Sequence, residues 1–152
     1  MSFRHGSIIL GAGEGTTIPV LGDSYTYKAA KEDTGGAYAL LECTVVGDGP
    51  PPHLHTTEEE AFYVLEGALN VLVGERTVTA TAGAFVHVPR GTVHTFSKAG
   101  TASAKLLILI SPAGFEKFFE EIAGPPDLEK IMALAPKYNF EIMGPPPEQR
   151  GR

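Results

Sequence analysis

Short apolar stretches alternate with clusters of Gly, Pro and Asp through the middle of this chain, and this alternation limits the fold more than any other feature. The stretches are rich in Val, Leu, Thr, Phe and Tyr, which favour β-strands. They lie at residues 37–46, 61–65, 69–73, 76–81, 85–89, 94–97 and 105–111, and an earlier strand pair is expected at 8–10 and 24–29. Strands of this length and spacing predict an all-β sandwich or barrel.

The periodicity becomes helical after residue 112. Large apolar side chains then recur three and four residues apart, which predicts one amphipathic helix packed on the barrel: Phe115, Phe118, Phe119 and Ile122. A second short helix is expected over residues 127–135. The 152 residues suffice for one domain. We expect it to comprise N-terminal strands and loops (1–35), a barrel core (36–112), C-terminal helices (113–144) and a flexible tail (145–152).

Composition excludes several classes of function. The formal net charge of −6 disfavours a nucleic-acid-binding surface, which needs clustered Lys and Arg. No apolar run reaches the ~20 residues of a membrane span, and the first residues lack the pattern of a signal peptide. The single cysteine, Cys43, cannot form an intrachain disulfide and is read as a buried strand thiol. We therefore expect a cytoplasmic protein without nucleic-acid or membrane partners.

The glycine-rich run at residues 11–15 is a poor candidate for phosphate binding. A dinucleotide-binding loop needs a helix directly after its glycines, whereas residues 16–20 have the pattern of extended chain. The sequence therefore predicts no nucleotide cofactor.

Histidine and glutamate residues form the strongest functional pattern. His53 and His55 are two residues apart, and on a strand this spacing turns both imidazoles to one face. Glu60 opens an apolar strand, where burial of its carboxylate is costly unless a cation compensates it. His94 follows a Pro-Arg-Gly turn, but the sequence alone does not place it beside the first pair. His5 and His87 are read as surface or structural residues.

The two segments resemble the two signature motifs of the cupin family. The first motif fits with His-x-His, four residues, a glutamate, six residues and a glycine, while its opening glycine fits only loosely: Gly49, His53, His55, Glu60 and Gly67. The second motif fits except at its final asparagine, which is Lys98 here: Gly83, Pro89, Gly91 and His94. The segment PPHLHTTEEEAFYVLEG is similar to the quercetin 2,3-dioxygenase-like branch of small single-domain cupins.

This resemblance implies a cupin double-stranded β-helix, also called a jelly-roll barrel, with one or two short C-terminal helices. It implies one divalent metal ion, of Fe, Mn, Ni, Cu or Zn, held by His53, His55, Glu60 and His94. Among three consecutive glutamates, Glu60 is preferred for its spacing to Gly67 and its strand parity with Phe62. Glu58 and Glu59 are interpreted as solvated turn charges.

A metal-dependent dioxygenase acting on a small enolisable or aromatic, flavonol-like compound is the leading functional hypothesis, with Glu60 as the catalytic base. Its substrate pocket is expected from residues that could equally be core packing: Phe62, Val64, Phe85 or Val86, and Phe96. The alternatives are a non-catalytic small-molecule sensor and a sugar isomerase or epimerase. Small cupins generally dimerise, so a homodimer is also expected, with residues 7–10 pairing along a neighbouring sheet edge.

Overall fold

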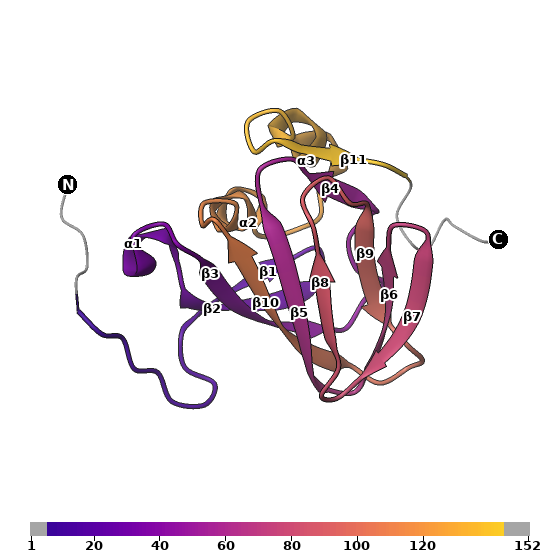
Figure 1. The fold of residues 1–152 in the computed structure, drawn as a ribbon, viewed down its shortest axis with the longest axis horizontal. Helices are drawn as coiled ribbons and strands as arrows, with labels where there is room; N and C mark the ends of the chain where they lie inside the picture. Colours follow the sequence, from indigo (N-terminus) through magenta and orange to yellow (C-terminus); the bar gives the residue numbers. More distant parts are fainter. Residues whose placement is uncertain (1–5, 145–152) are drawn as a thin grey trace.

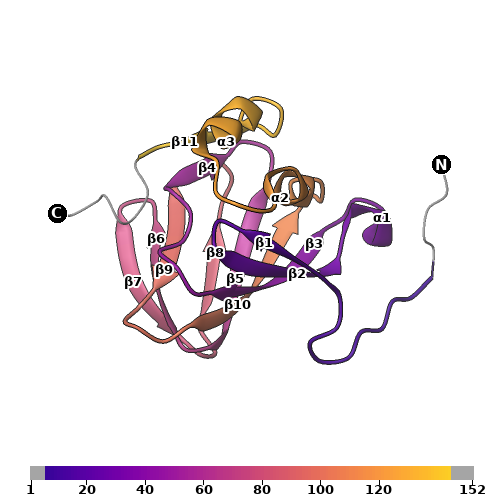
Figure 2. The same ribbon diagram turned by 180° about the vertical axis from the view of Figure 1, so that it is seen from behind.

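Two antiparallel sheets enclose the core of the protein in the computed structural model, which describes residues 6–144. One sheet has six strands in the order β1 (Thr16–Val20), β2 (Asp23–Ala29), β3 (Ala39–Val45), β10 (Ala104–Ser111), β5 (Glu59–Glu66) and β8 (Phe85–Val88). The other has five strands in the order β11 (Phe140–Ile142), β4 (His53–His55), β9 (His94–Lys98), β6 (Ala68–Val73) and β7 (Arg76–Thr81). Figures 1 and 2 show the two sheets facing each other. The predicted all-β jelly-roll fold is confirmed.

The period-two alternation of the strands forms the core between the sheets. In β3 every second residue is buried, and β10 and β5 follow the same pattern beside it. Leu41 and Cys43 on β3 are completely buried, so the interpretation of Cys43 as a core thiol is confirmed. Leu41 is paired in register with Ile108 of β10, which faces Phe62 of β5 in turn. One continuous row of apolar side chains therefore crosses the three central strands.

Short helices close one end of the barrel. α2 (Glu116–Ile122) and α3 (Leu128–Leu134) lie over the end where β4 and β11 are found, while α1 (Lys31–Thr34) lies to the side (Figure 1). The aromatic residues of the predicted amphipathic pattern face inward, since Phe115, Phe118 and Phe119 are all buried. Within residues 6–144, no helix is long and apolar enough to cross a membrane. The helices act as a cap on the barrel.

A buried glutamate fixes the position of this cap. Glu116 has no exposed surface, and its carboxylate accepts hydrogen bonds from the backbone N–H groups of Lys31 (2.8 Å) and Gly114 (2.6 Å). The backbone carbonyl of Glu116 accepts a hydrogen bond from the hydroxyl of Tyr27 on β2 at 2.6 Å. The bond from Tyr27 therefore ties the start of α2 to the six-stranded sheet, and the bond from Lys31 ties it to α1.

The N-terminal region differs from the expectation. Residues 8–10 form no strand, and the side chain of Ile9 is 92% exposed. The partner of β2 is β1, because Leu21 and Gly22 both have positive φ and make the two-residue turn that joins a hairpin. The glycine run at 11–15 leads into this strand rather than a helix, as the sequence indicates. The prediction of a strand at residues 8–10 is wrong.

Gly49 allows the proline-rich loop to reach the first histidine strand. Its φ is +79°, and a Cβ atom there would lie 1.7 Å from the carbonyl oxygen of Phe96 on β9. Pro50, the next residue, is also held against β9, since Thr95 donates its hydroxyl to the Pro50 carbonyl at 2.5 Å. The loop is therefore packed directly on β9 before the chain enters β4.

Replacing Gly49 by Ala should lower the free energy of unfolding more than replacing Gly74, which also has positive φ but no atom closer than 3.9 Å to its would-be Cβ. Both variants should lose about 1–2 kcal/mol through left-handed strain. Gly49→Ala should lose a further ~1–3 kcal/mol through overpacking. Urea unfolding of both variants measures the difference, and equal losses would contradict close packing of this loop.

Candidate metal centre

Strand β4 presents two histidines toward the barrel interior. His53 and His55 alternate with Leu54 along this three-residue strand, which lies between β9 and β11. His53 is paired in register with His94 of β9, while β11 places Phe140 opposite His55. The strand is too short to be stable alone, so its two neighbours hold the His-x-His segment in place.

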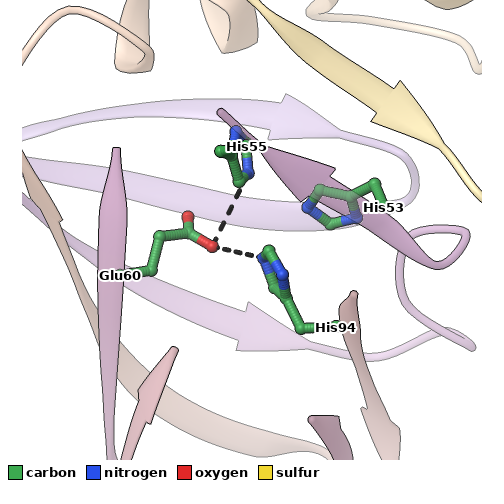
Figure 3. A group of neighbouring side chains, drawn as sticks. All are labelled: His53, His55, Glu60 and His94. Atoms are coloured by element: carbon green, nitrogen blue, oxygen red, sulfur yellow. Dashed lines mark hydrogen bonds and ion pairs between the residues drawn. The ribbon is translucent and has the colours of Figure 1, made fainter. Parts of the chain in front are cut away.

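Glu60 reaches the same point from the other sheet. It lies near the start of β5 in the six-stranded sheet, whereas the three histidines lie on β4 and β9 of the five-stranded sheet. Figure 3 shows the carboxylate between His55 and His94, with His53 beside them. Glu60 is 6% exposed and faces inward with Phe62 and Val64, as the strand parity predicts.

The donor atoms of these four residues converge. One ligand atom from each of His53, His55, Glu60 and His94 lies within 4.8 Å of the others. The Glu60 Oε2 atom is 2.5 Å from His94 Nε2 and 3.6 Å from His55 Nε2. The structure therefore brings together the four residues that the motifs single out, including His94, whose place the residues alone did not determine.

Backbone carbonyls orient two of the imidazoles. His53 donates its Nδ1–H to the Pro51 carbonyl at 2.8 Å, and His94 donates its Nδ1–H to the Thr92 carbonyl at 2.9 Å. A carbonyl can only accept a hydrogen bond, so each Nδ1 carries the proton. The Nε2 atoms of both rings are left to face the centre, and such partners behind a histidine fix its tautomer and orientation in metal sites.

Burial and charge set the protonation of the group. Burial lowers the pKa of both His53 and His55, that of His53 to about 3. Burial opposes ionisation of Glu60, but the neighbouring His55 and His94 outweigh it and lower the pKa of Glu60 to about 2. Burial also works against charge on His94, yet contact with Glu60 raises its pKa above the usual value. Burial thus favours the neutral forms of His53 and His55, while the contact between Glu60 and His94 favours the charged forms of both.

The residues fit a divalent metal ion. Both ring nitrogens of His55 are buried without a hydrogen-bond partner, although buried polar atoms nearly always have one. A cation bound between the four residues would contact His55 Nε2 as well as the donor atoms of the other three. Three imidazoles and one carboxylate without thiolate suit Fe, Mn, Ni, Cu or Zn rather than Ca or Mg. The group is therefore able to bind a metal.

An apolar cavity of about 50 Å³ adjoins this centre. Phe62 and Phe96 line it together with side chains of the cap, including Phe118 and Phe119 of α2. Val64 is buried but lies outside the lining. Phe85, however, is 64% exposed because it alternates with inward residues on β8, so its expected place in the pocket is wrong. Val86 packs against the core instead.

Sequence reasoning missed the environment of Glu58. Glu58 is 8% exposed, and burial raises the pKa of its carboxyl to about 7. The Glu58 Oε1 atom has no hydrogen-bond partner and lies 3.6 Å from His55 Nδ1. Glu59, which lies between Glu58 and Glu60 in the sequence, is directed outward and pairs with Arg90 at 3.2 Å. The interpretation of Glu58 as a solvated turn charge is wrong, whereas Glu59 behaves as expected.

The cap supplies further residues that the sequence did not connect with the site. Phe115 packs edge-on against His55 with ring centroids 4.2 Å apart, and Phe140 is also within ring contact of His55. The helical spacing indicated that Phe115 packs, but not against which residue. Strand β11 is three residues long, and no sequence signal indicated that it pairs with β4.

Comparison with known proteins agrees with this architecture. Residues 40–110 match a family model described as the cupin domain. Over 118 residues the chain is 28% identical to the quercetin 2,3-dioxygenase of Bacillus subtilis (strain 168), a match that covers 77% of this chain. The chain spans about a third of the length of this curated relative, 35% of it.

Solved structures share the fold at low sequence identity. A predicted oxalate decarboxylase from Thermotoga maritima has a TM-score of 0.64 at 18% identity, covering 69% of this chain and 99% of that one. The polyketide cyclase RemF from Streptomyces resistomycificus has 0.61 at 21% identity, covering 70% and 80%. An RmlC-like cupin from Shewanella frigidimarina NCIMB 400 has 0.59 at 19% identity, covering 75% and 96%.

The fold and the site together define a β-barrel protein with a three-histidine, one-glutamate group able to bind a metal ion. Residues 40–110 match the cupin domain, and over this range the chain is similar to cupins. The predicted resemblance, including its similarity to quercetin 2,3-dioxygenase, is confirmed.

Replacing His53, His55 or His94 by Ala should each weaken metal affinity at least about tenfold, since loss of an outer partner alone costs that much in metal sites. His87→Ala is the matched control, because His87 is exposed on β8 and lies outside the group. His5, which we also expect to take no part, lies outside the described residues. Metal titration of the four variants decides the matter, and unchanged affinity in any of the first three would remove that residue from the ligand set.

Proposed function

We propose that this protein is a metal-dependent dioxygenase acting on a small enolisable or aromatic compound. The observation behind this proposal is the convergence of His53, His55, Glu60 and His94 at the wall of an apolar cavity. These residues would hold one divalent ion. The ion, when bound, would supply a Lewis acid that polarises an enol or phenol oxygen. The similarity to a quercetin 2,3-dioxygenase supports the same class of reaction.

The cavity favours an uncharged, largely apolar substrate. Among its described lining residues none is Lys or Arg, and the only polar side chains besides Tyr25 belong to the metal group. A sugar phosphate needs cationic partners, so a sugar isomerase or epimerase fits poorly. Pockets for drug-sized ligands have volumes of roughly 300 Å³ or more, so a flavonol would enter only if the cap of α2 and α3 moved. A smaller enol or phenol needs less displacement.

Glu60 has the position of a general base. Its carboxylate is ionised, and Glu60 lines the cavity that a substrate hydroxyl would enter. A carboxylate within hydrogen-bond reach can accept the proton of that hydroxyl. His94, which is hydrogen-bonded to Glu60 Oε2, would hold the carboxylate in orientation.

A non-catalytic small-molecule-binding protein or sensor is the alternative, because the same barrel and the same metal group could bind a ligand without turnover. Oxygen consumption in the presence of metal and a flavonol or simpler enol separates the two. Elemental analysis of protein purified without added metal would name the ion. The expected cytoplasmic location stays a prediction.

Replacing Glu60 by Gln should reduce turnover about 10²–10⁴-fold, the usual contribution of a general base, and should reduce metal content much less. Gln keeps the size and one acceptor oxygen but cannot take the proton. Glu59→Gln is the matched control, since Glu59 is directed outward and its side chain is 43% exposed. Oxygen uptake and metal content are measured on both variants. Full activity in Glu60→Gln would exclude the general-base role.

We also propose that the chain forms a homodimer through residues 7–10. Ile8, Ile9 and Leu10 are all exposed, and residues 7–10 pair with no strand within the described residues 6–144. Unpaired backbone of this kind can add to an exposed sheet edge of a neighbour. Light scattering at micromolar concentration should show a dimer for the full chain and a monomer after removal of residues 1–10. If the truncated chain still formed a dimer, the interface would lie elsewhere.

A further inference from the structure

The three histidines of the metal group differ in what lies behind them. The Nδ1–H groups of His53 and His94 are each held by a backbone carbonyl within 2.9 Å. His55 has no such hydrogen bond, although it is only 2% exposed. An imidazole without a partner behind it can place its proton on either nitrogen and can turn about its side-chain bonds. His55 therefore lacks the orienting contact that the other two possess.

Glu58 occupies the place where that contact is missing. Its Oε1 atom is 3.6 Å from His55 Nδ1, and both atoms are buried without hydrogen bonds. Glu58 lies between the end of β4 at His55 and the start of β5 at Glu59, so the connection between the two strands brings its side chain back to the histidine. Phe115 packs edge-on against the same ring and restricts its movement. Two unpaired buried atoms of complementary type thus face each other.

We propose that Glu58 is the positioning residue of His55. Its carboxylate is placed 3.6 Å from His55 Nδ1, so a small shift of either side chain would let it accept the Nδ1–H. That hydrogen bond would fix the tautomer whose Nε2 lone pair faces Glu60 and the centre. Glu58 would thereby do for His55 what the carbonyls of Pro51 and Thr92 do for His53 and His94. This inference rests on the proposed metal centre, and it assigns to Glu58 a role distinct from that of Glu60. Carboxylates behind metal-binding histidines commonly have this orienting effect.

Zinc binding to three variants tests the proposal. Glu58→Ala should raise the dissociation constant for Zn²⁺ roughly 10- to 100-fold, the usual effect of losing such a partner. Glu58→Gln retains an acceptor oxygen of the same reach and should recover most of that loss. Glu59→Ala is the matched control, since the neighbouring carboxylate is directed outward to Arg90. It should bind Zn²⁺ as the unaltered protein does.

Two further measurements distinguish positioning from a general structural role. Nitrogen-15 NMR of the zinc-loaded protein should show His55 protonated at Nδ1, and this state should be lost or mixed in Glu58→Ala. Unfolding of the metal-free variants should show no loss of stability in Glu58→Ala, because the carboxylate it removes includes a buried atom without a hydrogen bond. A positioning residue thus lowers zinc affinity without lowering the melting temperature of the metal-free protein.

The outcomes separate this inference from the metal centre itself. Zinc affinity of Glu58→Ala within twofold of the unaltered protein would overturn the role of Glu58 and leave the metal centre in place. Weaker binding with the His55 tautomer unchanged, or with an equally large loss of metal-free stability, would also overturn it. An unaltered protein that bound no Zn²⁺ would overturn both proposals.

Discussion

The buried contact between Glu60 and His94 is the interaction on which the rest of the site depends. It joins the two sheets, since Glu60 lies on β5 and His94 on β9, with both residues almost without exposed surface. A buried carboxylate is costly unless a cation or hydrogen bonds compensate it. Here the 2.5 Å contact with His94 compensates it, and His53 and His55 complete the surroundings. Removing one partner would leave the other charge buried and unpaired.

The cap surrounds one side of this polar group with apolar side chains. Phe115 contacts His55 directly, and other aromatic side chains of α2 line the cavity beside the group. Charges interact more strongly in such surroundings than in water. Strand β11 adds a mechanical link, because it pairs with the histidine strand β4 and continues from α3. Displacement of the cap would therefore affect both access to the cavity and the orientation of His55.

The sequence predicts the parts of this arrangement that repeat or follow a short spacing. Alternating apolar residues indicate the strands, and the two-residue spacing of His53 and His55 indicates a shared face. The place of His94 followed from the family resemblance, because pairing between strands far apart in the sequence leaves no local pattern. Strand β11 could not be foreseen for the same reason, since pairing stabilises three residues that have no strand signal of their own. Phe85 was misplaced because parity next to the Pro89 turn does not determine which face is inward.

The three consecutive glutamates show how far strand parity reaches. Side chains on extended chain point alternately to opposite faces, so the rule that turns Glu60 inward and Glu59 outward also turns Glu58 inward. The structure follows this rule, with Glu58 and Glu60 buried and Glu59 paired with Arg90 at the surface. The error at Glu58 came from assuming that a residue before a strand belongs to a solvated turn. The alternation begins one residue before β5, and it places one carboxylate among the three histidines and another behind His55.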